Sequence, residues 1–381
     1  MPQIALRDDD GTLTMLRDSI AGFAKQNPGP PRLRAERNAR RGIAPAIWKQ
    51  FAEAGWIGLL LPEDAGGPGL TIREQVIVSE ALGRALAPEP YATLSVFAPA
   101  LLAGATRNAE RDRLCAGIIS GGAIVSVAWQ DKAAPAGAEP ASTKAVARDG
   151  GWSIDGAKVL VDASGAATDF LVVAETEGTA ALFYVPSDTA GLTVTSRPGI
   201  DGSEIAEIAL GNCRVDDRKL LQRAATADAL LRDPIQDTRL AIAAELSGLA
   251  GKALELTIGY TSQRVQFGKP IASFQVIQHR LVDMWMQAEL AGAAVRNAVE
   301  LRCKAATPRE IAIATFAAKA RAADAAMMIC RNAIHLYGAM GYTDECDIGL
   351  YLKRAINLGA MLGNSDTMRR LFLQAEQTSD H

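Results

Sequence analysis

The 381-residue sequence is poor in cysteine, in aromatic side chains and in charge of one sign. Its five cysteines are odd in number, far apart and never in a Cys-x-x-Cys pair, which argues against a disulfide framework and against a zinc site. Aromatic residues make up 5% of the chain while 49% of it is apolar, and alanine is abundant, a balance that favours closely packed helices. We therefore expect reduced, mostly buried cysteines and no metal.

The charge balance is weak and slightly acidic. A formal charge of −3 and a pI near 5.8 argue against an electrostatic surface for nucleic acid. No run of eighteen uncharged residues occurs, and the N-terminus is acidic, without the apolar segment of a signal peptide. We therefore expect no nucleic-acid partner, no membrane association and a cytoplasmic location.

Length and periodicity predict several domains, because 381 residues exceed what one hydrophobic core usually organises. Apolar residues recur with helical spacing in residues 1–122 and again in 234–381. Between 123 and 233 they form short, β-branched runs parted by Gly, Asp, Ser and Pro. The sequence thus predicts an α+β multidomain chain with an N-terminal helical domain, a middle antiparallel β-sandwich or barrel, and a C-terminal helical bundle.

Individual elements can be placed within a few residues. Strands are expected at 123–128, 151–155, 158–161, 170–174, 181–185, 193–195 and 205–210. Long helices are expected at 238–265, 274–305 and 308–340, with a shorter one from Asp366. Helices of this length joined by short loops are typical of a bundle.

The corner between the first two long helices carries the most chemistry. Gly268-Lys269-Pro270 ends one helix before the next begins near Phe274. The guanidinium of Arg264 suits a pyrophosphate, the ring of Phe267 suits stacking, and Gln275 suits a ribose or base edge. Together with Gln266 these residues predict a dinucleotide site, although such a corner alone is more often plain structure.

Two stretches near the C-terminus resemble the signatures of one family. They are Arg264-x-x-Phe267-Gly268-x-Pro270-Ile271-x-x-x-Gln275 and Leu336-Tyr337-Gly338-Ala339-Met340-Gly341-Tyr342-x-x-Glu345. With weaker matches at 55–69 and 80–83, they resemble the acyl-CoA dehydrogenases along nearly the whole chain. The resemblance implies helices, a β-domain and a four-helix bundle, with FAD held at a subunit interface.

The resemblance also implies a reaction and partners. A carboxylate removes the α-proton of an acyl-CoA thioester while hydride leaves the β-carbon for the flavin. Family members pair into dimers or dimers of dimers, and they pass electrons to an electron-transfer flavoprotein. A role in lipid or steroid catabolism follows as an expectation.

Site residues carry over position by position. Arg264, Phe267 and Gln275 are expected at the pyrophosphate and adenosine end of FAD, and Gly338 lets the backbone approach the phosphates. His335 stands where the family presents a glutamine from the neighbouring subunit, or else it is satisfied at a helix end. Further FAD contacts implied by the resemblance are Gln266, Trp129, Gln130, Asn364 and Asp366. Asp366 alternatively caps the last helix, and Arg239 matches an arginine used near the CoA.

The chain departs from the family where the catalytic base is expected. The usual glutamate position falls on Leu362, which accepts no proton. A second position used by some members falls on Thr238, also no base. Glu245 lies two helical turns further along, on a similar face, and is a weak candidate. Its ordinary alternative is a buried ion pair with an arginine.

These departures resemble the small or partner subunits of heteromeric acyl-CoA dehydrogenases, of the pimeloyl-CoA or steroid side-chain type. In such heterotetramers one subunit brings the base and the other completes a shared FAD site. Two alternatives stay open. One is a self-sufficient flavoprotein, a homodimer or homotetramer that uses Glu245, and the other is a scaffold subunit without flavin.

Overall fold

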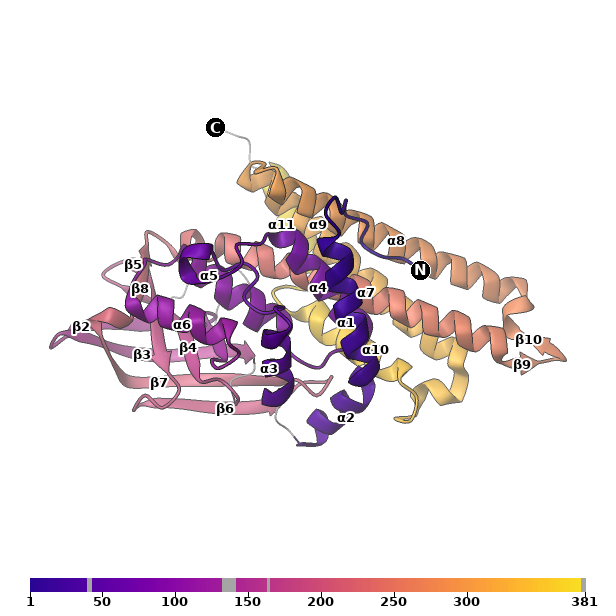
Figure 1. The fold of residues 1–381 in the computed structure, drawn as a ribbon, viewed down its shortest axis with the longest axis horizontal. Coiled ribbons are helices and arrows are strands. Elements are labelled where there is room, and N and C mark those ends of the chain that lie inside the picture. Colours follow the sequence, from indigo (N-terminus) through magenta and orange to yellow (C-terminus); the bar gives the residue numbers. More distant parts are fainter. Residues whose placement is uncertain (40–42, 132–141, 163–164, 378–381) are drawn as a thin grey trace. The chain divides into compact units, whose positions relative to one another are not determined.

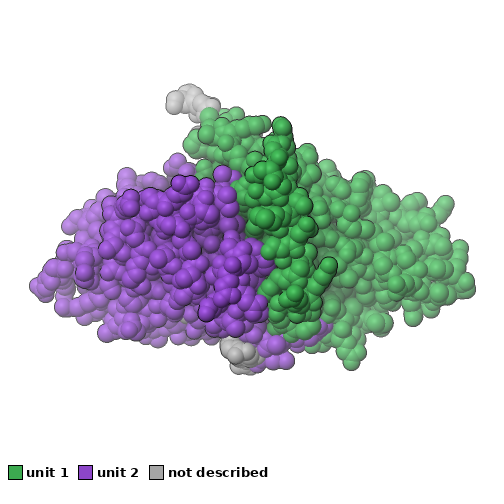
Figure 2. All heavy atoms as spheres, viewed as in Figure 1, with its two compact units in different colours: residues 1–33, 72–87, 239–381 green, residues 34–71, 88–238 purple. Residues whose placement is uncertain are grey.

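The computed structural model describes residues 1–39, 43–131, 142–162 and 165–377, which form two compact units (Figure 2). Unit 1 comprises residues 1–33, 72–87 and 239–381, and unit 2 comprises residues 34–71 and 88–238. Each unit joins segments that are far apart in the sequence. The predicted domain boundaries after residues 122 and 233 stay a prediction.

Unit 1 is built from helices (Figure 1). They are α1 (Thr12–Gln26), α4 (Ile72–Ala85), most of α7 (Ala227–Gln263), α8 (Gln275–Cys303), α9 (Pro308–Tyr337), α10 (Ile348–Ala360) and α11 (Ser365–Gln377). The central helix is α9, which packs against α8, α10 and α11. Its contact with α11 is apolar, since Met368 packs against Phe316 and Ala320. The predicted long helices are confirmed, whereas α10 was not predicted.

Helices α4 and α7 approach each other closely at two glycines. A Cβ on Gly83 would collide with the carbonyl oxygen of Glu245, and one on Gly248 would collide with that of Glu80. Only glycine allows two helix backbones to come this near. The crossing fixes the position of the α7 segment that carries Arg239 and Glu245.

Unit 2 contains an eight-stranded sheet in the order β6-β7-β3-β2-β4-β5-β8, with β1 paired to β4. The strands are β1 (Val125–Ala128), β2 (Lys144–Arg148), β3 (Gly151–Asp162), β4 (Asp169–Thr176), β5 (Thr179–Pro186), β6 (Leu192–Pro198), β7 (Glu204–Asp216) and β8 (Leu220–Ala224). The predicted β-domain is confirmed. Most neighbours are antiparallel as expected, but β1 and β2 both run parallel to β4, with Val125 opposite Asp169. The core of the sheet is apolar and includes Ile154, Phe170 and Phe183.

Helices also belong to unit 2 (Figure 1). They are α3 (Pro45–Glu53), α5 (Ala98–Gly104) and α6 (Ala109–Ile119), while α2 (Gly29–Ala39) begins in unit 1. A π-helical turn, Thr93–Phe97, leads into α5, and both contact β1. None of the helices that the structure describes is long and apolar enough to cross a membrane. Within the same residues no group of three or more His, Cys, Asp or Glu side chains could hold a metal ion.

Candidate active site

The predicted dinucleotide corner is a small hairpin in unit 1. Strands β9 (Val265–Gln266) and β10 (Lys269–Pro270) pair antiparallel directly after α7 ends. The two residues at its tip, Phe267 and Gly268, have φ values of 55° and 80°. A left-handed conformation costs a non-glycine residue roughly 1–2 kcal/mol, and here it leaves the Phe267 side chain 92% exposed. An aromatic ring is therefore held in the open at a strained turn.

The polar residues of this corner are open as well. Among the described residues, the exposed side chains of Arg264 and Gln275 make no hydrogen bond or ion pair. The Gln266 amide instead donates to the carbonyl oxygen of Val265 at 2.8 Å. The Phe267 ring meets Phe274 edge-on, with 6.1 Å between ring centroids. A guanidinium, an amide and a ring thus stand available together, which fits the expected FAD contacts.

The side chain of Arg280 contacts His335 near the end of α9. Nη1 of Arg280 lies 2.8 Å from Nδ1 of His335. Because a guanidinium only donates, Nδ1 accepts, and the neutral ring carries its proton on Nε2. The helix ends at Gly338, whose φ of 65° and ψ of −141° suit glycine alone. Arg280 was not predicted as a site residue, because it lies 55 residues from His335 in the chain.

The position expected for the catalytic base holds two buried cations. The carbonyl oxygen of Leu362, a residue with φ 54°, accepts a hydrogen bond of 3.0 Å from Nε of Arg239. Arg239 is 4% exposed, and its guanidinium lies 5.3 Å from the centre of the Phe316 ring. Burial lowers the pKa of Arg239 to about 10. Nothing in the sequence pattern pointed to the second cation.

That second cation is Lys319 of α9, which is fully buried. Its Nζ donates to the carbonyl oxygens of Leu358 at 2.8 Å and Gly359 at 3.2 Å, in the last turn of α10. Burial and the nearby charge of Arg239 lower the pKa of Lys319 to about 7. Within the described part of the chain, neither Lys319 nor Arg239 forms an ion pair with a carboxylate.

The two other positions considered for the base, Glu245 and Thr238, have structural partners. Oε1 of Glu245 accepts from Nε and Nη2 of Arg354, at 3.0 and 2.7 Å, and both side chains are buried. This is the ion pair that the sequence left open as the alternative to catalysis. The hydroxyl of Thr238 donates to the carbonyl oxygen of Pro234 at 2.7 Å.

Unit 2 places Trp129 and Gln130 directly after β1. The buried Trp129 ring meets Phe97 edge-on, with 6.2 Å between centroids. The carbonyl oxygen of Gln130 accepts from the backbone N–H of Val159 at 2.9 Å. This pairing lies beside Leu160, which has φ 56° and is largely exposed. Trp129 is thus held by an aromatic contact and Gln130 by a backbone hydrogen bond, directly after β1.

Asn364 and Asp366 lie at the start of α11. Oδ1 of Asn364 accepts from the N–H of Thr367 at 2.9 Å, so Asn364 caps the helix. Asp366 is exposed and accepts from Arg369 at 3.1 Å, one turn further along. The cap that the sequence analysis considered for Asp366 is therefore supplied by Asn364, while flavin contacts by either residue stay a prediction.

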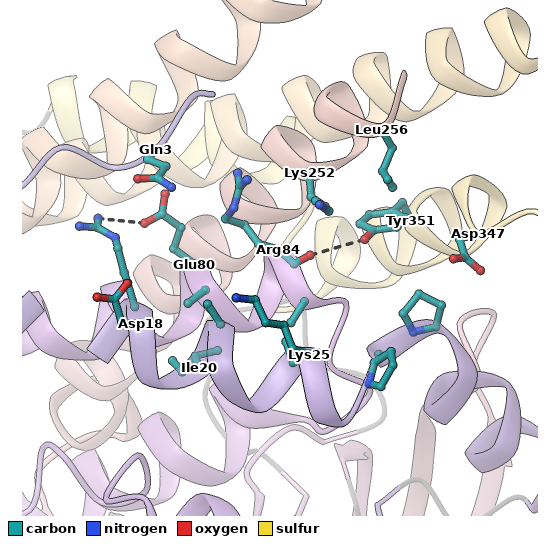
Figure 3. Close-up of a pocket in the computed structure, with 18 of the residues that line it drawn as sticks. Gln3, Asp18, Ile20, Lys25, Glu80, Arg84, Lys252, Leu256, Asp347 and Tyr351 are labelled. Atoms are coloured by element: carbon teal, nitrogen blue, oxygen red, sulfur yellow. Dashed lines mark hydrogen bonds and ion pairs between the residues drawn. The ribbon is translucent and has the colours of Figure 1, made fainter. Parts of the chain in front are cut away.

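Unit 1 also contains a cavity of about 770 Å³ between α1, α4, α7 and α10 (Figure 3). Charges of both signs surround it, and Glu80 pairs with Arg17 at 3.1 Å. Arg84 pairs with Glu255 at 2.5 Å, and its carbonyl oxygen accepts from the hydroxyl of Tyr351 at 3.5 Å. Because these groups largely neutralise one another, the cavity presents no charge of a single sign. None of the site residues predicted from the sequence lines it.

Two family models match the chain. The N-terminal domain of acyl-CoA dehydrogenases matches residues 11–122 and the C-terminal domain matches residues 229–376. The "Probable acyl-CoA dehydrogenase YngJ" of Bacillus subtilis is 30% identical over 93% of this chain and 95% of its own length. Acyl-CoA dehydrogenase IpdE2 of Mycobacterium tuberculosis is 30% identical over 94% of this chain and 95% of its own.

A solved structure extends the likeness to the fold. The Tcur3481-Tcur3483 steroid ACAD, in its G363A variant, superposes with a TM-score of 0.85 at 26% identity, over 96% of this chain and 97% of that one. Its order of helices, central sheet and helices is the order found here. The chain therefore belongs to the acyl-CoA dehydrogenases, FAD-dependent oxidoreductases that act on the CH–CH bond of acyl-CoA thioesters.

Proposed function

We propose that this chain is the subunit of a heteromeric acyl-CoA dehydrogenase that binds FAD but takes its catalytic base from a partner chain. One observation carries the proposal. At the position expected for the base, Leu362 offers only a backbone carbonyl, and that carbonyl is bound by the buried Arg239. A leucine accepts no proton, so the α-proton must leave to another carboxylate.

The cofactor residues support the flavin half of this proposal. The unpaired guanidinium of Arg264 suits the FAD pyrophosphate, and the exposed Phe267 ring suits stacking on the adenosine end. Gln275 offers a free amide for a ribose or base edge. When bound, FAD supplies the acceptor for the hydride of the β-carbon. Nε2–H of His335 and the guanidinium of Arg280 would face an anionic group of the cofactor.

An exposed apolar face on α8 supports the proposal that a partner chain binds. Large apolar side chains are exposed there, at Val276, Val282, Trp285, Met286 and Leu290. The last four recur at spacings of three, one and four residues, which places them on one side of the helix. A stripe of this kind usually marks a protein interface. We assign it to association with a homologous chain.

The relatives suggest the pathway. The steroid ACAD is named for two proteins together, and its likeness to this chain favours a heterotetramer that acts on a CoA thioester from steroid or lipid catabolism. An electron-transfer flavoprotein is the acceptor that we propose. Both assignments come from relatives rather than from a residue of this chain.

The first test is the visible spectrum and the mass of the chain, purified alone with excess FAD and then co-expressed with a base-bearing acyl-CoA dehydrogenase. We expect flavin in stoichiometric amount, and bleaching of its absorbance by an acyl-CoA, only in the mixed complex. Stoichiometric flavin in a homo-oligomer that an acyl-CoA bleaches would overturn the proposal. Persistent absence of flavin from both preparations would favour the scaffold alternative.

The self-sufficient alternative has its own test. If Glu245 were the base, Glu245→Gln would abolish bleaching of the purified chain while leaving flavin bound. The Arg354 ion pair instead gives Glu245 a structural role, so we expect the substitution to lower stability. Arg354→Met breaks the same pair and keeps the carboxylate, which makes it the matched control. Equal effects of both substitutions on bleaching exclude Glu245 as the base.

A further inference from the structure

Two positive charges are buried together in unit 1 without a negative one. Arg239 and Lys319 both bind carbonyl oxygens at the end of α10 and in the residues that follow it. A helix C-terminus carries only about half a negative charge. Removing one cation from water costs several kcal/mol even after the protein relaxes. The charge of Arg239, and below about pH 7 that of Lys319 as well, therefore stays without an anion within the described residues.

Another buried arginine of the same unit has the carboxylate partner that Arg239 lacks within the part of the chain that the structure describes. Arg354 is as deeply buried as Arg239, at 3% exposed against 4%. Its Nη2 lies 2.7 Å from Oε1 of Glu245, so its charge is neutralised inside the protein. Arg239 uses only Nε, and its two Nη groups have no hydrogen-bond partner among the described residues. The unused part of the guanidinium is the fork that binds a carboxylate through two parallel hydrogen bonds.

A carboxylate fits this place better than a phosphate does. Phosphate sites in proteins usually gather several backbone N–H groups. Here the backbone offers carbonyl oxygens to the cations, and the N–H of Gly363 already donates to Ala360 at 3.2 Å. The guanidinium lies over the apolar Phe316 ring, and such surroundings suit a carboxylate carried on an acyl group better than a hydrated inorganic ion.

We propose that Arg239, supported by Lys319, binds a carboxylate carried by the acyl group of the substrate. The substrate is then a CoA thioester with a second carboxylate close to the thioester and a hydrogen on its β-carbon, as in alkylmalonyl or succinyl thioesters. This inference rests on the proposed function, because it takes Leu362 to lie where the reacting carbons are. The ligand supplies the negative charge that a glutamate at position 362 would otherwise provide.

The test compares the affinities of CoA thioesters matched in length, measured by calorimetry on the flavin-loaded complex. Succinyl-CoA is set against butyryl-CoA, and methylmalonyl-CoA against isobutyryl-CoA. We expect the carboxylated member of at least one pair to bind ten times more tightly or better. Arg239→Gln removes this ratio, while Arg296→Gln, which changes an exposed arginine of α8, keeps it.

A second variant works in the opposite direction and guards against misfolding of the first. Leu362→Glu places a carboxylate within reach of Arg239, so the protein's own anion occupies the site and the ratio falls toward one. Leu362→Gln keeps the size without the charge and keeps the ratio. Sodium acetate at millimolar concentration, added alone, tells a general anion site from one that needs the thioester.

Each possible result of the binding measurements either supports or excludes the carboxylate site. Equal affinities within both pairs exclude the carboxylate site and leave the acyl-CoA dehydrogenase role intact. Competition by acetate as strong as that by the carboxylated thioester also excludes it, since a small anion would suffice. Absence of binding by any CoA thioester overturns the inference together with the proposed function, and only this last outcome touches both.

Discussion

Among the residues that the structure describes, each unit buries one lysine completely, and the two lysines have different partners. In unit 2 the ammonium of Lys158 lies 2.9 Å from Oδ1 of Asp131 and also donates to the carbonyl oxygen of Trp129. In unit 1 the ammonium of Lys319 meets carbonyl oxygens only, and its charged neighbour is the cation Arg239. One buried charge is neutralised by the fold, and the other is not.

The pKa of each buried lysine depends on the charge of its nearest neighbour. Burial lowers the pKa of Lys158 to about 8 although Asp131 opposes the shift, and it lowers the pKa of Lys319 to about 7 with Arg239 adding to it. Burial alone would raise the pKa of the Asp131 carboxyl, but the hydrogen bond from Thr143 and the charge of Lys158 lower it. A neutralised pair serves structure, whereas an unneutralised cation is kept where function needs it.

The largest effect is expected from breaking the neutralised pair. Asp131→Asn leaves the Lys158 ammonium buried without an anion, so we expect the free energy of unfolding of unit 2 to fall by about 3–5 kcal/mol. Urea unfolding followed by tryptophan fluorescence measures it, because Trp129 and Trp152 both belong to this unit. The double variant Asp131→Leu with Lys158→Met removes both charges and should recover most of the loss. A loss below about 1 kcal/mol in the single variant would contradict a structural role for the Asp131–Lys158 pair.

The converse change adds an anion next to the two buried cations of unit 1, Arg239 and Lys319. Leu362→Glu brings a carboxylate beside Arg239, and a buried charge pair with good geometry should raise the free energy of unfolding of unit 1 by about 1–2 kcal/mol. Leu362→Gln is the control, and it should bring no gain. Thermal unfolding in the absence of ligand measures both variants. A Leu362→Glu protein that melts below the Leu362→Gln protein would show that the two cations already have an anion.

The pH dependence of stability should separate the two lysines. An unfolded lysine keeps its proton up to about pH 10.5, while folded Lys319 releases it near pH 7. Above pH 7 the unfolded state therefore binds more protons, so stability rises with pH, by about 1.4 kcal/mol per pH unit for one group. Below pH 7 both states are protonated and the cost of the buried charge is constant.

The measurement is the free energy of unfolding at intervals from pH 6 to 9. We expect Lys319→Met to lose the rise that begins near pH 7, and Lys158→Met to lose the one that begins near pH 8. Each variant serves as the control of the other. Parallel curves for the wild type and both variants would mean that neither lysine titrates in this range.

The contrast between the lysines could not be predicted from the sequence, although the fold largely could. Helical spacing and β-branched runs identified the long helices and most strands, because those patterns are local. Strands β2 (Lys144–Arg148) and β8 (Leu220–Ala224) were missed because polar residues interrupt them. The parallel pairing of β1 with β4 joins residues 44 apart, and a local pattern does not contain it.

The residues of the candidate site also fall into those that a local motif predicts and those that depend on long-range contacts. Arg264, Phe267 and Leu362 could be proposed as site residues because they belong to compact motifs with a family counterpart, and their roles stay predictions. Lys319 sits in an alanine-rich helix, where a lone lysine looks like a solvated residue. Its role depends on a contact with Leu358, 39 residues later, in a helix that the sequence did not predict. Arg280 was missed for the same reason, since its partner His335 lies on another helix.

The smallest effect is expected at the surface, where water neutralises charge. Asp366 pairs with Arg369 one turn along α11, and both side chains are largely exposed. Exposed pairs of this kind contribute between about 0 and 1 kcal/mol, so Asp366→Asn should change the free energy of unfolding by less than about 0.5 kcal/mol. Asn364→Ala removes a backbone cap two residues away and should cost about 1 kcal/mol. If Asp366→Asn lowers the free energy of unfolding more than Asn364→Ala does, Asp366 has a buried partner in the assembled protein. Its charge then belongs with the buried charges and not with the exposed ones.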